Sequence, residues 1–205
     1  MPKTKEQNEQ LKKERIDSIY RAALYLFATR GFNGVTSDDI TNAAKCSHGL
    51  LYHYFGSKEE LFQHLINDIV LKLDEEITKD VDFTQRPKFL IRDLLNAYLG
   101  ALKQPRDDYA CAIYLLLNLY IQSRFTPKVK KTFKFRIFEN IYCTIEEGKK
   151  VGEFSDYPTR ELTILLLSVL KGLSYNRINL GHKNCIIPRS EIIMKMILKE
   201  EGRNA

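Results

Sequence analysis

The sequence predicts an all-α protein of about nine helices. Apolar residues recur every three or four positions through most of the 205 residues, which is the spacing of one face of an α-helix. Prolines and glycines fall between these stretches, where they can start or end helices. The sequence has neither the alternating pattern of a half-buried strand nor a glycine-rich phosphate-binding loop. These observations predict a three-helix head followed by a larger helical bundle.

Three helix-start signals lie close together in the first third of the chain. Thr36 can cap a helix, with Asp39 three residues later as its capping-box partner. Ser47 and Ser57 can cap the next two helices. Two short helices separated by a three-residue break form a helix-turn-helix unit, whose second helix is suited to a DNA major groove. The sequence therefore predicts a DNA-binding motif at about residues 36–55.

At these residues the chain resembles the TetR family of transcriptional regulators. The positions shared at the family's spacing are Gly31, Phe32, Thr36, Ile40, Ala44, Ser47, Gly49, Leu51, Tyr52, Phe55, Lys58 and Leu61. Thr41 and Lys45 depart from the family, which usually has Ala and Gly there. In a left-handed conformation Lys45 would cost about 1 kcal/mol relative to Gly. The resemblance implies a homodimer that binds double-stranded operator DNA and a small-molecule inducer.

The helical pattern and the resemblance divide the chain into three parts. Residues 1–14 are polar and are expected to form a flexible N-terminal arm or the frayed start of the first helix; residues 15–60 form the helix-turn-helix DNA-binding domain; and residues 61–205 form a helical ligand-binding and dimerisation domain. The helix that starts near residue 57 is long enough to link the head to the body. Helices are expected near residues 15–30, 37–44, 48–54, 57–79, 87–103, 107–123, 127–150, 158–180 and 188–200.

The second helix of the motif is expected to present its DNA-facing side opposite Leu51 and Phe55, which are spaced to anchor it in the core. Gly49 costs roughly 0.5–1 kcal/mol relative to Ala in such a helix, and close approach to DNA would explain it. His48 could contact a guanine edge or a phosphate, and Leu50 a thymine methyl group. The residues expected at the DNA are Thr36, Lys45, Ser47, His48, Gly49, Leu50, Tyr52, His53 and Lys58.

Lys58 stands at the start of the long helix, where free N–H groups and the helix dipole favour a phosphate. Thr36 occupies the same kind of position one helix earlier. Plain helix capping accounts for these residues equally well, and a capping side chain can also face the duplex.

The distribution of charge limits the argument for DNA. The net charge of +6 and the pI of about 9.0 favour an anionic partner. The first sixty residues, however, contain nine Lys or Arg and eight Asp or Glu, which leaves a net charge of only +1 there and +5 in the rest. Affinity for DNA must therefore come from individually placed groups and from dimerisation.

In the body, aromatic side chains fit an amphipathic ligand pocket between helices, although they fit an ordinary core as well. Through the resemblance, the expected pocket residues for an apolar or amphipathic inducer are Tyr98, Tyr114, Phe138 and Tyr142. The last two helices could either cap the bundle or form a four-helix dimer interface. The expected dimer contacts are Leu162, Leu166, Val169, Leu173, Ile193 and Ile197.

Other classes of protein receive no support from the sequence. The four cysteines show no metal-binding spacing, and the four histidines form no ligand pair, so we expect neither a metal nor a cofactor. Ser47 and His48 have no third partner for catalysis, and we expect no enzyme activity. The polar N-terminus and the absence of an 18-residue apolar run predict a cytoplasmic protein without a membrane span.

The sequence therefore predicts a repressor that binds a palindromic operator as a dimer and is released by an inducer. Two alternatives remain. One is a ligand-independent activator with the same head, and the other is a helical ligand-binding or interaction module with weak or no DNA binding. DNA binding that weakens steeply with salt would favour the repressor or the activator over the interaction module.

Overall fold

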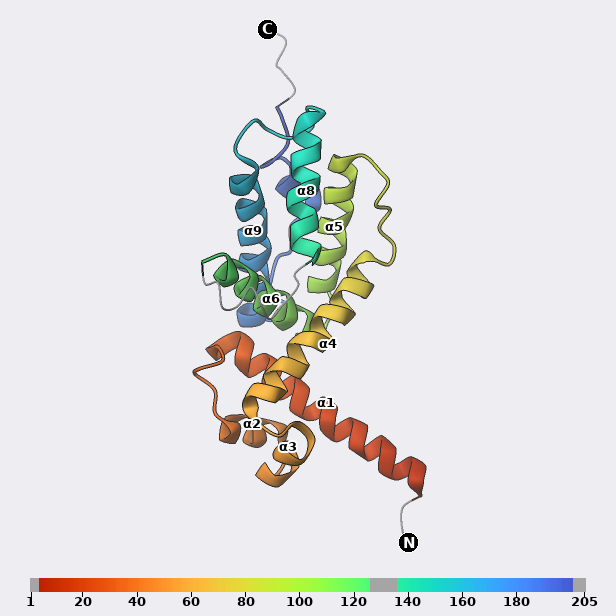
Figure 1. Cartoon of the computed structure of the whole chain (residues 1–205), viewed down its shortest axis with the longest axis vertical. Helices are drawn as coiled ribbons and strands as arrows, with labels where there is room; N and C mark the ends of the chain where they lie inside the picture. Colours follow the sequence, from red (N-terminus) through yellow and green to blue (C-terminus); the bar gives the residue numbers. More distant parts are fainter. Residues whose placement is uncertain (1–3, 126–135, 201–205) are drawn as a thin grey trace. The chain divides into compact units, whose positions relative to one another are not determined.

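The computed structural model describes residues 4–125 and 136–200, and these contain nine α-helices (Figure 1). The predicted all-α fold is confirmed. The helices fall into two compact units, residues 1–69 and 70–205. No helix among the described residues is long and apolar enough to cross a membrane.

The first unit contains α1 (Lys5–Arg30), α2 (Ser37–Ala44), α3 (His48–Phe55) and the first part of α4 (Lys58–Thr78). The bounds of α2, α3 and α4 lie within about one residue of those predicted, because each helix starts after the predicted capping residue. Apolar side chains from all four helices form the core of this unit: Ile19, Ala23, Phe27, Ile40, Leu51, Phe55, Leu61, Leu65 and Ile66.

Of the two alternatives for residues 1–14, a flexible arm or the start of the first helix, the structure shows the second for residues 5–14. Residues 5–14 are helical because Thr4 caps them: the Gln7 amide donates to Thr4 Oγ1 (3.2 Å), and the Thr4 amide donates to Gln7 Oε1 (3.0 Å). These turns extend beyond α2 and α3 and are largely exposed (Figure 1). A capping box at Thr4 therefore extends the helix although few apolar anchors are present.

The second unit contains five labelled helices after α4. They are α5 (Pro87–Leu102), α6 (Asp108–Phe125), α8 (Arg136–Lys150), α9 (Thr159–Leu180) and α10 (Ser190–Met194). Helices α5, α8 and α9 run side by side, α6 packs against α9, and α10 packs against α5 (Figure 1). The part of the predicted 127–150 helix that precedes α8 lies outside the described residues.

The predicted last helix, 188–200, is wrong beyond Met194. After α10 the chain pairs with the segment between α8 and α9: the Ser155 amide donates to Ile197 O (2.9 Å), and the Lys199 amide donates to Glu153 O (3.1 Å). Phe154 and Leu198 form an isolated antiparallel bridge there. The apolar spacing of this segment resembles that of a helix, but its backbone hydrogen bonds go to a distant segment.

Arg177 of α9 holds the C-terminal end of α5. Its side chain is buried, and Nε donates to Leu102 O (3.1 Å), while Nη2 donates to Gln104 O (2.9 Å) and Pro105 O (3.2 Å). Its Nη1 lies 2.6 Å from Asp107 Oδ1. A single guanidinium thus satisfies the last carbonyl of α5 and two carbonyls of the following turn.

Glu153 holds the other end of α5. Its buried carboxylate accepts a hydrogen bond from the Lys88 amide (2.9 Å) and lies 2.7 Å from Arg86 Nη2. Residue 86 itself provides no side-chain cap, and Pro87 occupies the first helical position. A carboxylate from 65 residues further along the chain therefore supplies the negative group that a helix N-terminus favours.

Candidate DNA-binding site

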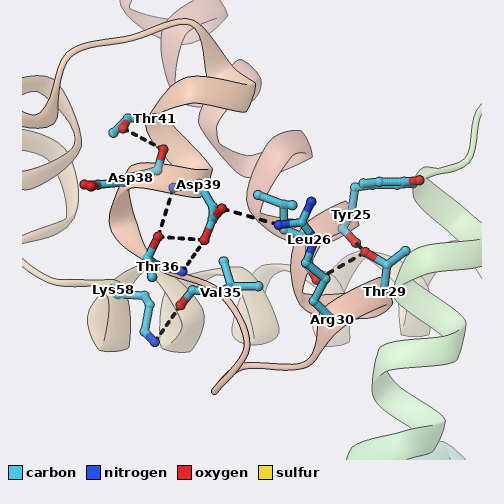
Figure 2. A network of polar contacts seen from close by, with 10 residues as sticks. All are labelled: Tyr25, Leu26, Thr29, Arg30, Val35, Thr36, Asp38, Asp39, Thr41 and Lys58. Carbon is cyan, nitrogen blue, oxygen red and sulfur yellow. Dashed lines mark hydrogen bonds and ion pairs between the residues drawn. The ribbon is translucent and has the colours of Figure 1, made fainter.

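The start of α2 is joined to the end of α1 by a polar network (Figure 2). The Asp39 amide donates to Thr36 Oγ1 (3.1 Å), and the Thr36 amide and hydroxyl donate to Asp39 Oδ2 (2.8 and 2.6 Å), so the predicted capping box is confirmed. Arg30 Nη1 lies 3.3 Å from Asp39 Oδ1. The hydrogen bonds from Thr36, helped by Arg30, lower the pKa of the Asp39 carboxyl. Thr36 remains exposed, but its hydroxyl is engaged with Asp39.

The turn between α2 and α3 places α3 through two local features. Lys45 adopts the left-handed conformation, with φ 52° and ψ 46°, at the position where the family usually has Gly. Ser47 caps α3 as predicted, since the Leu50 amide donates to Ser47 Oγ (3.3 Å). Leu51 and Phe55 are buried and fix the rotation of α3.

Four residues of α3 outside this anchor are exposed. They are His48, Gly49, Tyr52 and His53, and the Tyr52 side chain keeps 48% of its surface in solvent. A Cβ placed on Gly49 would meet no atom within 4 Å, so packing inside the protein does not require glycine there. Leu50 is half-buried. An exposed glycine among aromatic rings on a short helix fits a surface that another molecule approaches closely.

Side chains from the first turns of α2 contact the exposed rings of α3, and the sequence analysis did not predict these contacts. His48 Nε2 lies 2.7 Å from Asp38 Oδ1 and 3.3 Å from Thr41 Oγ1. The Tyr52 hydroxyl donates to Ser37 Oγ at 3.4 Å. The one sequence signal was the departure of Thr41 from the family's Ala, which places a hydroxyl between the two helices.

Lys58 corrects the expectation of a phosphate contact. Its Nζ donates to Val35 O (2.9 Å) and Phe32 O (3.2 Å) and lies 4.2 Å from the centre of the Phe32 ring (Figure 2 draws the bond to Val35). The side chain is half-buried. Lys58 thus ties the start of α4 to the α1–α2 loop, and its charge is directed into the head.

The predicted pocket aromatics have different surroundings in the described structure. Tyr98 is buried, and Tyr142 is exposed on α8. The Tyr114 ring packs against Tyr175 (5.7 Å between ring centres) and lies under Lys171 (5.6 Å), so it belongs to the α6–α9 contact. The Phe138 side chain lies outside the described residues.

A pocket of about 600 Å³ lies instead among the end of α4, α5 and the start of α6. Its lining is mixed: the polar residues are Glu76, Lys79, Asp80, Asp93, Asn96, Gln104 and Tyr109, and Val81, Ala97 and Ala101 are apolar. The Tyr109 hydroxyl donates to Glu76 Oε2, and this bond is the main reason why the pKa of Tyr109 is raised. None of the three described aromatics predicted for the ligand lines this pocket.

The expected dimer contacts need a similar correction. Leu162, Leu166, Ile193 and Ile197 are at most 3% exposed and form part of the chain's own core, so they have no surface to offer a partner. Val169 and Leu173 are half-buried. The sequence pattern of α9 is apolar on more than one face, which is why it did not separate the core stripe from the outer one.

Cys111 is a poor candidate for a reactive thiol. Burial raises the pKa of Cys111 to about 12, and the carboxylates of Asp107 and Asp108 contribute. Because the thiolate is the reactive species, this residue is suited to packing in α6.

The head has the architecture of a helix-turn-helix DNA-binding domain. The family model described as "Bacterial regulatory proteins, tetR family" matches residues 19–65. The HTH-type transcriptional repressor KstR2 of Rhodococcus jostii (strain RHA1) is 30% identical over 149 residues, 70% of this chain and 69% of KstR2. The chain belongs to the TetR family of transcriptional regulators.

Two further similarities define how far the likeness extends. The HTH-type transcriptional regulator HbdR of Aromatoleum sp. (strain CIB) is 26% identical over 147 residues, 72% of this chain, and the match spans 64% of HbdR, less than two thirds of its length. Among solved structures, ketosteroid transcriptional regulator KstR2 of Mycobacterium tuberculosis has a TM-score of 0.63 at 19% identity, covering 91% of this chain and 96% of that chain. The structural likeness shows a shared fold.

Replacing Lys58 by Met should destabilise the head by about 1–2 kcal/mol. The Met side chain keeps the apolar stem, but two loop carbonyls lose a charged donor and the Phe32 ring loses its cation. Urea denaturation measures the free energy of unfolding. Lys45→Met is the matched control, because Lys45 is exposed, and it should leave stability unchanged. If Lys58→Met left stability unchanged and weakened binding to all DNA sequences equally, the result would support the predicted phosphate contact by Lys58.

Proposed function

We propose that this chain is a cytoplasmic transcriptional repressor that binds a palindromic operator as a homodimer and is released by a small molecule. The observation that carries the proposal is the exposed face of α3, anchored behind by Leu51 and Phe55 and lined by His48, Gly49 and Tyr52. A helix of this length with a free, side-chain-rich face fits the major groove. Relatives named as repressors, such as KstR2, support the direction of regulation.

The charges of the head favour two heads on one duplex. Arg30 pairs with Asp39 and Lys58 donates to two loop carbonyls, so two cations of the head already have partners in the free protein. Helix N-termini and neutral side chains can position the head, but they give one short helix little affinity. A dimer doubles these contacts and demands half-sites about 34–36 Å apart.

Selection from a randomised duplex DNA library with the full chain tests the proposal. The enriched sequences should contain two inverted half-sites whose centres lie about 34–36 Å apart, with two chains bound per site. The binding constant should fall steeply as salt rises. Absence of enrichment, or retention of duplexes without sequence preference, would overturn the operator-binding function and favour an interaction module.

Replacing Gly49 by Ala should separate stability from DNA binding. Because the new Cβ meets nothing within 4 Å, the helix should gain about 0.5–1 kcal/mol. The methyl group should nevertheless weaken operator binding at least about tenfold if the helix lies against the DNA. Urea denaturation and fluorescence anisotropy with a labelled operator measure the two effects.

Gly100→Ala in α5 is the matched control for this substitution, because its Cβ is also free of contacts. It should not weaken binding in the absence of an inducer. Unchanged binding by Gly49→Ala would place the DNA away from this part of α3.

We assign the dimer interface to the apolar side of α9 that faces solvent, here called the outer stripe, and not to the side that packs in the chain's own core. Leu165 and Leu180 are 37% and 53% exposed, and Val169 and Leu173 are half-buried on the same side. Gly172 lies among them and is exposed, and a Cβ there would meet nothing within 4 Å. An apolar stripe with a gap for close approach suits packing against the same helix of a second chain.

Replacing Leu165 by Arg should convert the dimer to a monomer without unfolding it. The new charge would be buried without a partner in the dimer but solvated in the free chain. Sedimentation velocity at micromolar concentration measures the change. Val151→Arg is the control, since Val151 is 61% exposed and lies outside α9, and it should stay dimeric. A dimeric Leu165→Arg protein would rule out this stripe.

The inducer site is best placed in the pocket formed by α4, α5 and α6. Its carboxylates, Glu76, Asp80 and Asp93, are balanced in part by Lys79, whose Nζ lies 4.0 Å from Asp80 Oδ2, so the pocket favours a ligand that carries hydrogen-bonding groups over a wholly apolar one. Helix α4 carries both Glu76 and Lys58. A ligand that shifts this helix would therefore disturb the hydrogen bonds from Lys58 to the α1–α2 loop. Thermal stabilisation by apolar compounds alone, in a panel that includes amines, would contradict this ligand class.

A further inference from the structure

The ring of His48 has one nitrogen occupied by the protein and one free. Nε2 lies 2.7 Å from Asp38 Oδ1 and 3.3 Å from Thr41 Oγ1. The Thr41 hydroxyl already donates its hydrogen to Asp38 O (3.1 Å), as Figure 2 shows. Thr41 is 2% exposed, so its hydroxyl is confined between the helices. Nε2 therefore faces two oxygen atoms that can only accept.

Two acceptors on one side of an imidazole determine which nitrogen carries the hydrogen. We assign it to Nε2 from this hydrogen-bond network, since an unprotonated Nε2 would face both oxygen atoms without a donor. Nδ1 is then an acceptor in the neutral ring and a donor in the protonated ring. No hydrogen bond of the described residues involves Nδ1, and the His48 side chain is 50% exposed. The group that His48 can offer to DNA is Nδ1.

We propose that Asp38 and Thr41 are positioning residues that determine base preference through His48, without contacting the DNA themselves. They hold the Nε2 edge of the ring against α2, and the ring lies beside that of Tyr52 (6.4 Å between ring centres). The neutral ring can accept from the amino group of adenine or cytosine, and the protonated ring can donate to guanine. This inference rests on the proposed operator binding and identifies how α2 contributes to specificity.

The test compares Asp38→Ala, Asp38→Asn, His48→Ala and the double variant Asp38→Ala/His48→Ala in the full chain. Affinities are measured for the selected duplex and for duplexes with each base pair of the half-site replaced. Discrimination is the ratio of the affinities for the selected duplex and for a duplex with one base pair replaced. At the base pair where His48→Ala abolishes discrimination, Asp38→Ala should reduce this ratio about fivefold. Asp38→Asn should retain most of it, because the amide oxygen still accepts from Nε2. The double variant should match His48→Ala.

The ratio of affinities for two duplexes separates the change in base preference from the general effect of removing a negative charge. Removing the Asp38 carboxylate should strengthen binding to every duplex alike, since it removes repulsion of phosphates, and that gain cancels in the ratio. Asp38 is not the side chain that caps α2, so Asp38→Ala should fold normally. Thr41→Val provides a second variant that keeps the shape of the side chain and removes one acceptor, and it should reduce discrimination at the same base pair.

Two outcomes would overturn the inference. One is that Asp38→Ala changes all affinities equally and leaves every base preference intact. The other is that Asp38→Ala changes base preference at base pairs where His48→Ala has no effect, since Asp38 would then act independently of His48. Failure of the wild-type chain to select inverted half-sites would instead overturn the proposed function itself, so the two failures are distinguishable.

Discussion

The helix-turn-helix depends on satisfying the backbone groups at the ends of two very short helices. Helices α2 and α3 have eight residues each, which is too short for stability in isolation. Their ends must therefore be held by side chains, and Thr36, Asp39 and Ser47 do this locally. Lys58 extends the same function to the loop before α2 by binding the carbonyls of Phe32 and Val35. Cations placed to hold the backbone are not available to phosphates.

The same use of charge recurs in the second unit. Arg177 and Glu153 bind backbone groups at opposite ends of α5, and each comes from far along the chain. Burying such groups is costly unless they are paired. Backbone carbonyls accept from Arg177 and the Lys88 amide donates to Glu153, while Asp107 and Arg86 supply the opposite charges. The chain's net charge of +6 therefore gives little information about its partner, because several of its cations stabilise the fold.

Local signals in the sequence predicted the head well, and long-range contacts explain what was missed. Thr36 and Ser47 cap their helices through residues three positions away, a distance that a sequence pattern can show. Lys58 looked like a free cation because its acceptors lie 23 and 26 residues earlier. The stripe of α9 that includes Leu162 and the stripe that includes Leu165 have similar composition, and only packing against α6 and α8 distinguishes them.

The contacts between α2 and α3 change how recognition by the head should be understood. A recognition helix held only by its buried side chains would leave long exposed rings free to rotate, and ordering them on the DNA would cost conformational entropy. Ser37 contacts Tyr52, and Asp38 contacts His48, before any DNA is bound. Part of that ordering is therefore complete in the free protein. Substitutions at Ser37 or Asp38 would remove these contacts and leave the rings of Tyr52 and His48 to be ordered only when another molecule binds.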